Sequence, residues 1–394
     1  MINDEPWTFD NLPVDVLSHY LFPSMGMRSL LLAAAVSQTW ASAAGKALEL
    51  WRLLEFESSY RLDGAPCFLA ALPTGEIVST EASANAALIR LLTLDAMTQS
   101  AKRIGGRNFS DALRVLRPTG VAVDVSSDEL FVACSESRSV QRYCLSSGRV
   151  VGRPWHGHAV TGAAVDQVWP GSFGPLPGHW QPYGLALTHD PCGTRLLFVA
   201  DSKWHRIVVL RGCGASGGLT PADDEAGFTL HASWGCHGEE PGQFDHPRGV
   251  AIEHGEHGMR VWVCDRGNDR LQCFTPDGVL VKCLGGSGRA PGCFLGPYDL
   301  TFVDRRLIVS EFEGRRVQVL TPDGAPLQVL HLADDGFVDG WSHHGSPCPT
   351  GVVAHGQRVY VAQFSGAPKL HVYRVAGPPC RMQPARHSAR CGEE

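Results

Sequence analysis

A segment rich in glycine, with a single phenylalanine near its end, occurs twice in this chain, 50 residues apart. The first copy runs from Trp234-Gly235 through Gly238 and Pro241-Gly242-Gln243-Phe244 to Pro247, and the second runs from Gly285 through Gly288 and Pro291-Gly292-Cys293-Phe294 to Pro297. A repeat of this length in a strand-rich chain is typical of the blades of a β-propeller, because one blade cannot bury both of its faces alone. The repeat therefore constrains the fold, while the function has to be read from other residues.

Short apolar runs alternate with Gly, Pro, Asp and Ser from about residue 66 onward, as strands alternate with turns. Five inner strands are predicted to begin at a proline, which suits the first residue of a strand because no ladder N–H is needed there. These prolines are Pro118, Pro182, Pro247, Pro297 and Pro349. Two further strand-like runs follow each of them, and Thr-Pro-Asp-Gly at 275–278 and 321–324 predicts tight turns into a fourth strand.

A weaker first copy covers residues 67–93, so the sequence predicts a mainly β fold, a six-bladed β-propeller over residues 66–375. The last unit shows three strands, and a segment near Ser59–Leu62 is expected to supply its fourth strand. Residues 152–179 and 212–229 are Gly/Pro-rich and are expected to be projecting loops. The Pro-rich tail, residues 376–394, is predicted to be disordered.

The second strand of the fourth unit ends in Val263-Cys-Asp265-Arg-Gly-Asn268-Asp-Arg270, and this pattern resembles the NHL-repeat propellers. The resemblance implies a ring with a narrow axis and two broad faces that grip partners. Asp201 with Arg206 and Glu311 with Arg316 keep part of the pattern. Two interpretations of these polar residues stay open. They pin the same turn in each blade by local bonds, or Arg206, Arg270 and Arg316 form a partner-binding face for an acidic or phosphorylated peptide.

Residues 11–55 follow a ten-residue N-terminal extension, residues 1–10, and differ in pattern from the rest of the chain. Apolar residues recur at helical spacing, as in Leu17 with Leu21 and in Leu32, Val36 and Trp40, which predicts three short amphipathic helices. This small segment buries too little apolar surface to be stable alone, so it is expected to pack on the propeller or on another protein.

The Leu-Pro opening, the leucine run before Val36 and Trp40, and the closing Leu50-Trp51 resemble an F-box. The resemblance implies docking into the Skp adaptor of a cullin-RING ubiquitin ligase by burial of apolar helix faces. The residues that would carry this contact or the core beneath it are Leu12, Pro13, Leu17, Leu21, Leu30, Val36 and Trp40. A plain helical cap on the propeller is the alternative.

Composition excludes some classes of function. The net charge of −6 disfavours nucleic acid and anionic membrane surfaces as partners. No basic and apolar leader is seen at the N-terminus and no apolar run approaches the length of a transmembrane helix, so a cytoplasmic, and possible nuclear, location is expected. The thirteen cysteines include no Cys-x-x-Cys spacing and are expected to be reduced thiols. No metal site, catalytic residue or cofactor is predicted, and the paired histidines (His156/His158, His254/His257 and His343/His344) fall in predicted loops.

Three functional hypotheses follow. The chain is a non-catalytic substrate-recognition subunit of an SCF-type ubiquitin ligase, with an unknown protein substrate on the propeller and the Skp adaptor on the helices. It is a propeller scaffold for protein–protein interaction without a ubiquitin role. It is, with least support, a metal-dependent propeller enzyme or an RNA-binding propeller.

Overall fold

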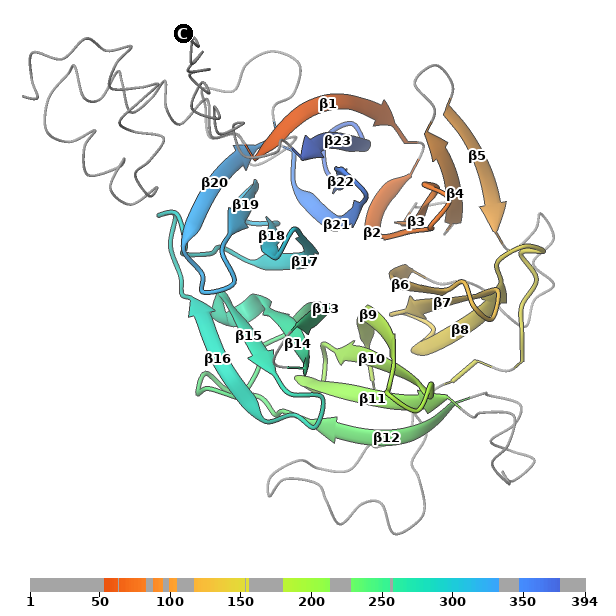
Figure 1. Cartoon of the computed structure of the whole chain (residues 1–394), viewed down its shortest axis with the longest axis horizontal. Helices are drawn as coiled ribbons and strands as arrows, with labels where there is room; N and C mark the ends of the chain where they lie inside the picture. Colours follow the sequence, from red (N-terminus) through yellow and green to blue (C-terminus); the bar gives the residue numbers. More distant parts are fainter. Residues whose placement is uncertain are drawn as a thin grey trace, which may run out of the picture. The chain divides into compact units, whose positions relative to one another are not determined.

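The computed structural model describes residues 53–62, 64–82, 88–94, 99–104, 117–152, 154–155, 180–212, 228–255, 258–332 and 347–375. Contacts divide the chain into two compact units, one formed by Phe56–Tyr373 and the other by residues 1–55 together with 374–394. The first unit is a ring of six β-sheets, seen down its axis in Figure 1. The predicted six-bladed β-propeller is thus confirmed.

Each blade is an antiparallel meander whose first strand lies next to the axis (Figure 1). Blades 1 to 3 consist of β2 (Ala65–Ala71), β3 (Ile77–Ala82), β4 (Leu88–Leu94) and β5 (Gln99–Ile104); β6 (Pro118–Asp124), β7 (Glu129–Cys134) and β8 (Ser139–Cys144); and β9 (Pro182–His189), β10 (Arg195–Asp201), β11 (Arg206–Gly212) and β12 (Phe228–Trp234). Blade 2 has three strands in its described residues, and single bridges from Val140 to Trp155 and from Tyr143 to Val150 extend it outward.

Blades 4 to 6 continue the order. They consist of β13 (Pro247–Gly255), β14 (Gly258–Asp265), β15 (Arg270–Phe274) and β16 (Leu280–Gly285); β17 (Pro297–Val303), β18 (Arg306–Glu311), β19 (Arg316–Leu320) and β20 (Pro326–His331); and β21 (Pro349–His355), β22 (Arg358–Gln363) and β23 (Lys369–Val375). A 3-10 turn, η5 (Arg266–Asn268), joins β14 to β15. The five predicted proline starts are the first residues of β6, β9, β13, β17 and β21.

The fourth strand of blade 6 comes from the other end of the sequence. Strand β1 (Leu54–Arg61) lies beside β23, so one sheet combines strands from both ends of the ring sequence. The ring therefore begins earlier than the predicted boundary at residue 66, and the strand-forming segment starts a few residues before the expected Ser59–Leu62. Because this pairing joins the first and last strands of the ring sequence in one sheet, it closes the ring.

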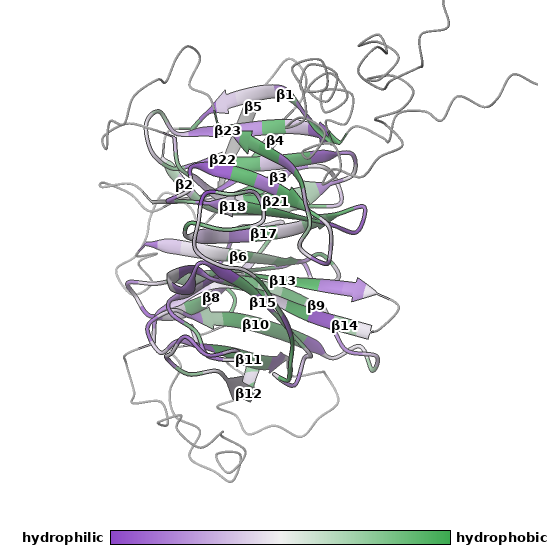
Figure 2. Ribbon diagram, turned by 90° about the vertical axis from the view of Figure 1, so that its left-hand side faces the viewer, coloured by the Kyte–Doolittle hydropathy of each residue, from purple (hydrophilic) through white to green (hydrophobic). Residues whose placement is uncertain are grey.

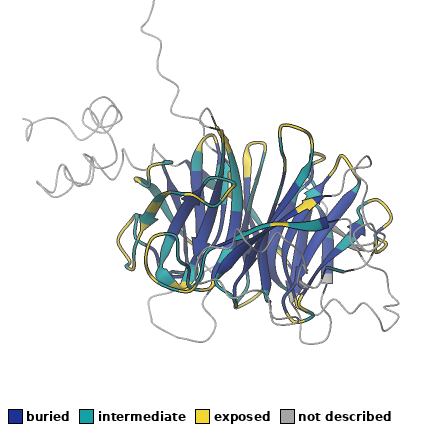
Figure 3. Cartoon of the chain, turned by 90° about the horizontal axis from the view of Figure 1, so that it is seen from below, coloured by how far each residue is buried: buried dark blue, intermediate teal, exposed yellow. Residues whose placement is uncertain are grey.

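Burial is greatest in the second and third strands of a blade and lowest in the outer strand. All six residues of β7 and all five of β19 are buried, whereas β16 alternates between half-buried and exposed positions. Figures 2 and 3 show apolar, buried strands within the ring and polar, exposed loops at its edges. The apolar clusters lie between neighbouring blades, as where Phe198 of blade 3 shares one cluster with Phe274 of blade 4. Each blade thus buries its faces against the next one.

Neighbouring inner strands contact one another around the whole axis. Four of them carry glycine at the point of closest approach, Gly120, Gly184, Gly249 and Gly351. A Cβ on Gly120 would lie 1.9 Å from the Tyr183 carbonyl oxygen, and one on Gly184 would lie 2.2 Å from the Arg248 carbonyl oxygen. A Cβ on Gly249 would lie 2.6 Å from the Asp299 Cα, and one on Gly351 would lie 2.7 Å from the Phe68 Cα. The obstructing atoms belong to backbone, which cannot rotate away. These glycines therefore set the spacing of the blades.

Gly184→Ala is expected to lower the unfolding free energy of the ring by about 1–3 kcal/mol, because an added methyl forces two inner strands apart. Urea denaturation measures this change. The matched control is Gly255→Ala, since Gly255 lies at the end of β13 with no atom within 4 Å of its ideal Cβ. Equal midpoints for the two variants would contradict the close-approach explanation.

No helix among the described residues combines the length and the apolar character needed to cross a membrane. Ten of the thirteen cysteines fall in the described residues, and all ten are thiols.

Candidate functional site

The repeated glycine-rich segment forms the loop between the outer strand of one blade and the inner strand of the next. In the first copy the Phe244 N–H donates to the Cys236 carbonyl at 2.8 Å and the Gly238 N–H donates to the Phe244 carbonyl at 3.1 Å. In the second copy the Phe294 N–H donates to the Gly286 carbonyl at 2.9 Å and the Gly288 N–H donates to the Phe294 carbonyl at 3.0 Å. The sequence repeat thus encodes one loop conformation, with a fully buried phenylalanine beneath it.

A carboxylate and an arginine face each other across the turn between the second and third strands of blades 3, 4 and 5. Asp201 is opposite Arg206, Asp265 is opposite Arg270, and Glu311 is opposite Arg316. The N–O distances are 3.0, 2.8 and 2.6 Å, and the three carboxylate side chains have no exposed surface. Burial is the largest influence on the pKa values of Asp265 and Glu311 and raises both, against the opposing effect of the arginines.

The arginines of blades 4 and 5 also hold the glycine-rich loop. Arg270 donates to the Glu240 carbonyl at 2.9 Å and to the Gln243 carbonyl at 2.9 Å. Arg316 donates to the carbonyls of Ala290 and Cys293 at 3.4 and 2.7 Å. The bonds are equivalent in the two blades, because each accepting residue lies 50 positions after its counterpart and the two arginines lie 46 positions apart. Each arginine therefore links the turn of its blade to the loop that precedes that blade.

The three arginines predicted to form a partner-binding face occupy equivalent places in successive blades. Arg206 and Arg316 are buried, and Arg270 is half-buried. Each of them donates a hydrogen bond to the carboxylate opposite it in its own blade, as a turn-pinning role requires. Contact of these residues with a partner stays a prediction.

Aromatic side chains from three blades meet at the centre of the ring. Phe68 of blade 1, Tyr183 of blade 3 and Tyr298 of blade 5 belong to one buried cluster. The guanidinium of Arg248 stacks on the Tyr183 ring at 3.5 Å and lies 5.9 Å from the Tyr298 ring. The guanidinium thus makes a favourable cation–π contact with two rings of the buried cluster.

Asp299 stands in β17 at the position where β6, β9, β13 and β21 have glycine. Its carboxylate accepts the Leu300 N–H at 2.9 Å and the Val352 N–H of the next blade at 2.9 Å. Burial raises the pKa of Asp299 to about 8, although both hydrogen bonds act in the opposite direction. The side chain is thus a buried link between blades 5 and 6 whose ionisation falls near neutral pH.

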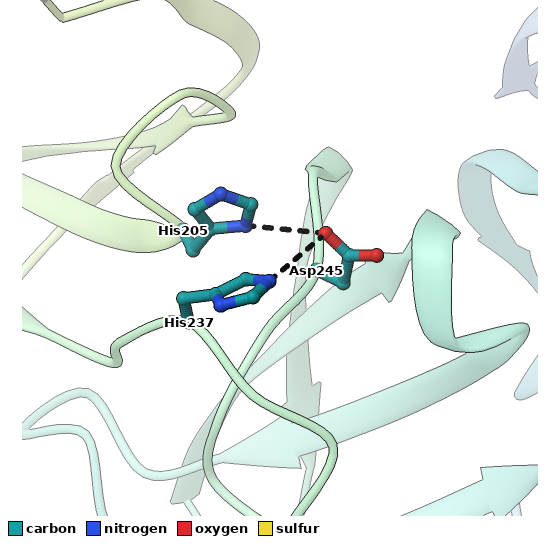
Figure 4. Close-up of side chains that lie close together, drawn as sticks. All are labelled: His205, His237 and Asp245. Atoms are coloured by element: carbon teal, nitrogen blue, oxygen red, sulfur yellow. Dashed lines mark ion pairs between the residues drawn. The ribbon is translucent and has the colours of Figure 1, made fainter.

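Three ligand-type side chains that the sequence analysis did not single out come together between blades 3 and 4 (Figure 4). His205 lies in the β10–β11 turn, and His237 and Asp245 lie in the loop between β12 and β13. His205 Nδ1 is 3.4 Å and His237 Nε2 is 3.7 Å from Asp245 Oδ1. Burial and the nearby His246 and His237 lower the pKa of His205 to about 4, so its imidazole is neutral at neutral pH.

The sequence signal for this cluster is weak because its members are 32 and 8 residues apart and belong to two blades. Alignment of the two glycine-rich copies offers the available signal: it sets His237, Asp245 and His246 opposite Ser287, Leu295 and Gly296. Of the histidines that the sequence analysis paired, His254 contacts Thr188 Oγ1 at 3.2 Å, and the other five lie outside the described residues. The seven predicted adaptor-binding residues also lie outside them.

No family model matches the chain. A stretch of 111 residues, 28% of the chain, is 31% identical to the RING finger protein nhl-1 of Caenorhabditis elegans. That stretch is 11% of the relative's own length, so the chain spans about a ninth of the curated relative that it matches.

Similar solved structures include a luciferin-regenerating enzyme (TM-score 0.49, 11% identity, 81% of this chain and 95% of the other). They also include a catalytically inactive virginiamycin B lyase from Staphylococcus aureus with quinupristin (TM-score 0.47, 14% identity, 82% of this chain and 100% of the other). A chain of a nidogen/laminin complex has a TM-score of 0.44 at 18% identity, over 76% of this chain and 86% of the other. At these TM-scores the likeness carries no information about function.

Proposed function

We propose that this chain is the substrate-recognition subunit of an SCF-type cullin-RING ubiquitin ligase. The ring binds a target protein, and the F-box-like residues 11–55 dock the Skp adaptor. The chain performs no chemistry itself and brings two other proteins together. The observation that carries the ring's part is the use of its buried polar side chains to hold its own loops in place, which presents a rigid platform for recognition.

The adaptor's part rests on the apolar pattern of the N-terminal residues. Leu17 and Leu21 share one helix face, and Leu30, Val36 and Trp40 follow the F-box-like order. Such faces bind a partner by burying apolar side chains in a groove. The similarity to nhl-1 supports an NHL-type ring and does not extend to this segment's role.

A propeller scaffold without a ubiquitin role is the second candidate. It shares the same rigid ring, and the plain helical cap on the propeller is its counterpart for residues 11–55. A protein partner on the ring is common to both candidates. Association with an adaptor is the property that separates them.

The full chain is expected to co-purify with a Skp-type adaptor, and Leu17→Asp combined with Leu21→Asp is expected to abolish this association, because two carboxylates in an apolar groove lose their hydration. Co-expression followed by size-exclusion chromatography measures it. The matched control is Val279→Asp combined with Val281→Asp, since both valines are exposed at the outer strand of blade 4, at 58% and 45%.

Thermal unfolding of both double variants checks that the ring stays folded. The proposal would be overturned if the leucine variant still bound the adaptor, or if the unmodified chain eluted without it. Either result would favour the scaffold.

A further inference from the structure

The cluster between blades 3 and 4 has a donor set typical of a transition-metal site. His205, His237 and Asp245 each offer one ligand atom, and these atoms all lie within 4.8 Å of one another. Two imidazoles and one carboxylate are the ligands of several zinc sites that keep a further position open. The cluster therefore has the ligand types and the number that such a site needs.

The two distances from the imidazole nitrogens to the Asp245 carboxylate oxygen are close to those around one bound ion. In a tetrahedral site with ligands about 2.0–2.1 Å from zinc, neighbouring ligand atoms are about 3.3 Å apart. His205 Nδ1 and His237 Nε2 are 3.4 and 3.7 Å from Asp245 Oδ1. These separations are longer than those of good hydrogen bonds and close to the edges of such a tetrahedron. Figure 4 shows both ring nitrogens directed toward the same carboxylate oxygen.

The next blade junction shows what the repeat needs at these positions. There Asp269, Ser287 and Leu295 stand in the places of His205, His237 and Asp245. The framework bond at that junction runs from the Gly296 N–H to Asp269 Oδ1 at 2.7 Å, and its counterpart runs from the His246 N–H to His205 Nδ1 at 3.0 Å. Only the acceptor at the first position takes part in a bond that both junctions share, so a histidine at 237 and an aspartate at 245 serve no repeated structural purpose.

His246 adds a cost that the repeat avoids. Its φ is +50°, and Gly296 takes the same place at the next junction with a φ of +58°. A non-glycine residue in this left-handed region is unfavourable. A hydrogen bond between His246 Nδ1 and Asp245 Oδ1, at 2.7 Å, offsets this backbone strain and orients the carboxylate. An orienting hydrogen bond of this kind is typical of the partners that surround metal ligands.

The Asp245 carboxylate is held by packing on one side and is accessible to solvent on the other. Asp245 Oδ2 packs so closely on Gly267 that a Cβ there would lie 2.2 Å away. The Asp245 N–H donates to Asp265 Oδ1 at 2.7 Å. On the other side the His237 side chain is 70% exposed, so an ion can reach the cluster from solvent.

From this geometry we propose that His205, His237 and Asp245 bind a zinc-type divalent transition metal that joins blade 3 to blade 4, with a remaining coordination position open to water. His246 is a positioning residue for Asp245. A metal bound at His205 Nδ1 displaces the hydrogen bond that the His246 N–H donates to this nitrogen. Because His246 lies at the surface, water can accept from its N–H instead. Imidazole nitrogen and carboxylate oxygen favour Zn²⁺ over the hard cations Ca²⁺ and Mg²⁺.

Isothermal titration of the full, untagged chain with Zn²⁺ tests the proposal, with Mg²⁺ and Ca²⁺ as hard-cation probes. His237→Ala is expected to weaken the binding of one zinc equivalent by about 100-fold, a loss comparable to those that follow from disturbing a zinc site. His205→Asn is expected to do the same while keeping the fold, because asparagine tolerates a positive φ and still offers an acceptor to the His246 N–H. The matched control is His331→Ala, at an exposed position of β20.

Two further readouts separate a site from a surface histidine pair. Zinc is expected to raise the thermal midpoint of the unmodified chain and of His331→Ala, and to leave that of His237→Ala unchanged. Cobalt(II) is expected to give the visible absorption of a tetrahedral site in the unmodified chain, and to lose it in His205→Asn. Equal zinc affinity and stoichiometry in the unmodified chain and in His237→Ala, or no zinc binding by the unmodified chain, would overturn the proposal.

Discussion

Arg316→Ala is expected to lower the unfolding free energy of the ring by about 3–5 kcal/mol, as the loss of one partner from a buried ion pair does. The Glu311 side chain has no exposed surface, so the substitution leaves a buried carboxylate without its cation. The carbonyls of Arg289 and Cys293 lose a donor at the same time. Urea denaturation followed by tryptophan fluorescence measures the effect.

Arg149→Ala is the control, because Arg149 lies at an exposed position after β8 and an ordinary surface substitution changes stability by about 0.5 kcal/mol or less. Arg316→Lys is expected to restore little, since an ammonium cannot reproduce the planar fork of donors that Arg316 directs at a carboxylate and several carbonyls. A double-mutant cycle with Glu311→Ala then gives the coupling energy of the pair.

This experiment also separates the two interpretations of the repeated arginines. If Arg316 acts as part of the framework, its loss lowers stability and disturbs the glycine-rich loop. If its main task is to bind a partner, Arg316→Ala unfolds at the same urea concentration as Arg149→Ala and loses only the binding of the partner. A midpoint equal to that of the control would therefore contradict the framework role.

Much of the ring could be predicted because its signals are local. Proline at the start of an inner strand, the Thr-Pro-Asp-Gly turns and the glycine-rich copies each act within a few residues, and β6, β9, β13, β17 and β21 begin at the predicted prolines. The ends of the closing strand are harder to predict. Strand β1 pairs with β23 more than 300 residues away, and no turn or repeat in its sequence marks where it begins or ends.

The metal-type cluster could not be predicted because its meaning depends on contact between blades. His205 looks like a turn residue, and His237 and Asp245 look like polar loop residues, until the blade 3–blade 4 junction brings them together. A comparison of each repeat position with its counterpart 50 residues on would have found Asp245 and His246, where the next copy has Leu295 and Gly296. Departures from an internal repeat are thus more informative here than groupings along the sequence.

Asp299 is such a departure, and it is expected to make the stability of the ring depend on pH. Burial raises its pKa from the ordinary value of 3.8 to about 8. The folded state therefore keeps the proton over a pH range in which the unfolded chain has released it. The contribution of this group to stability is complete below about pH 4 and is lost as the pH rises to about 8, at about 1.4 kcal/mol per pH unit.

Asp299→Asn removes this titration, so the unfolding free energy of the variant relative to the unmodified chain is expected to rise by about 4 kcal/mol from pH 5 to pH 8. Urea denaturation of both chains at pH 5, 6, 7 and 8 measures the difference, in which the other titrating groups largely cancel. Asp277→Asn, at an exposed turn position after β15, is the control, and its difference from the unmodified chain is expected to stay constant. A constant difference for Asp299→Asn as well would mean that the carboxylate between blades 5 and 6 is ionised in the folded ring, held there by the Leu300 and Val352 N–H groups.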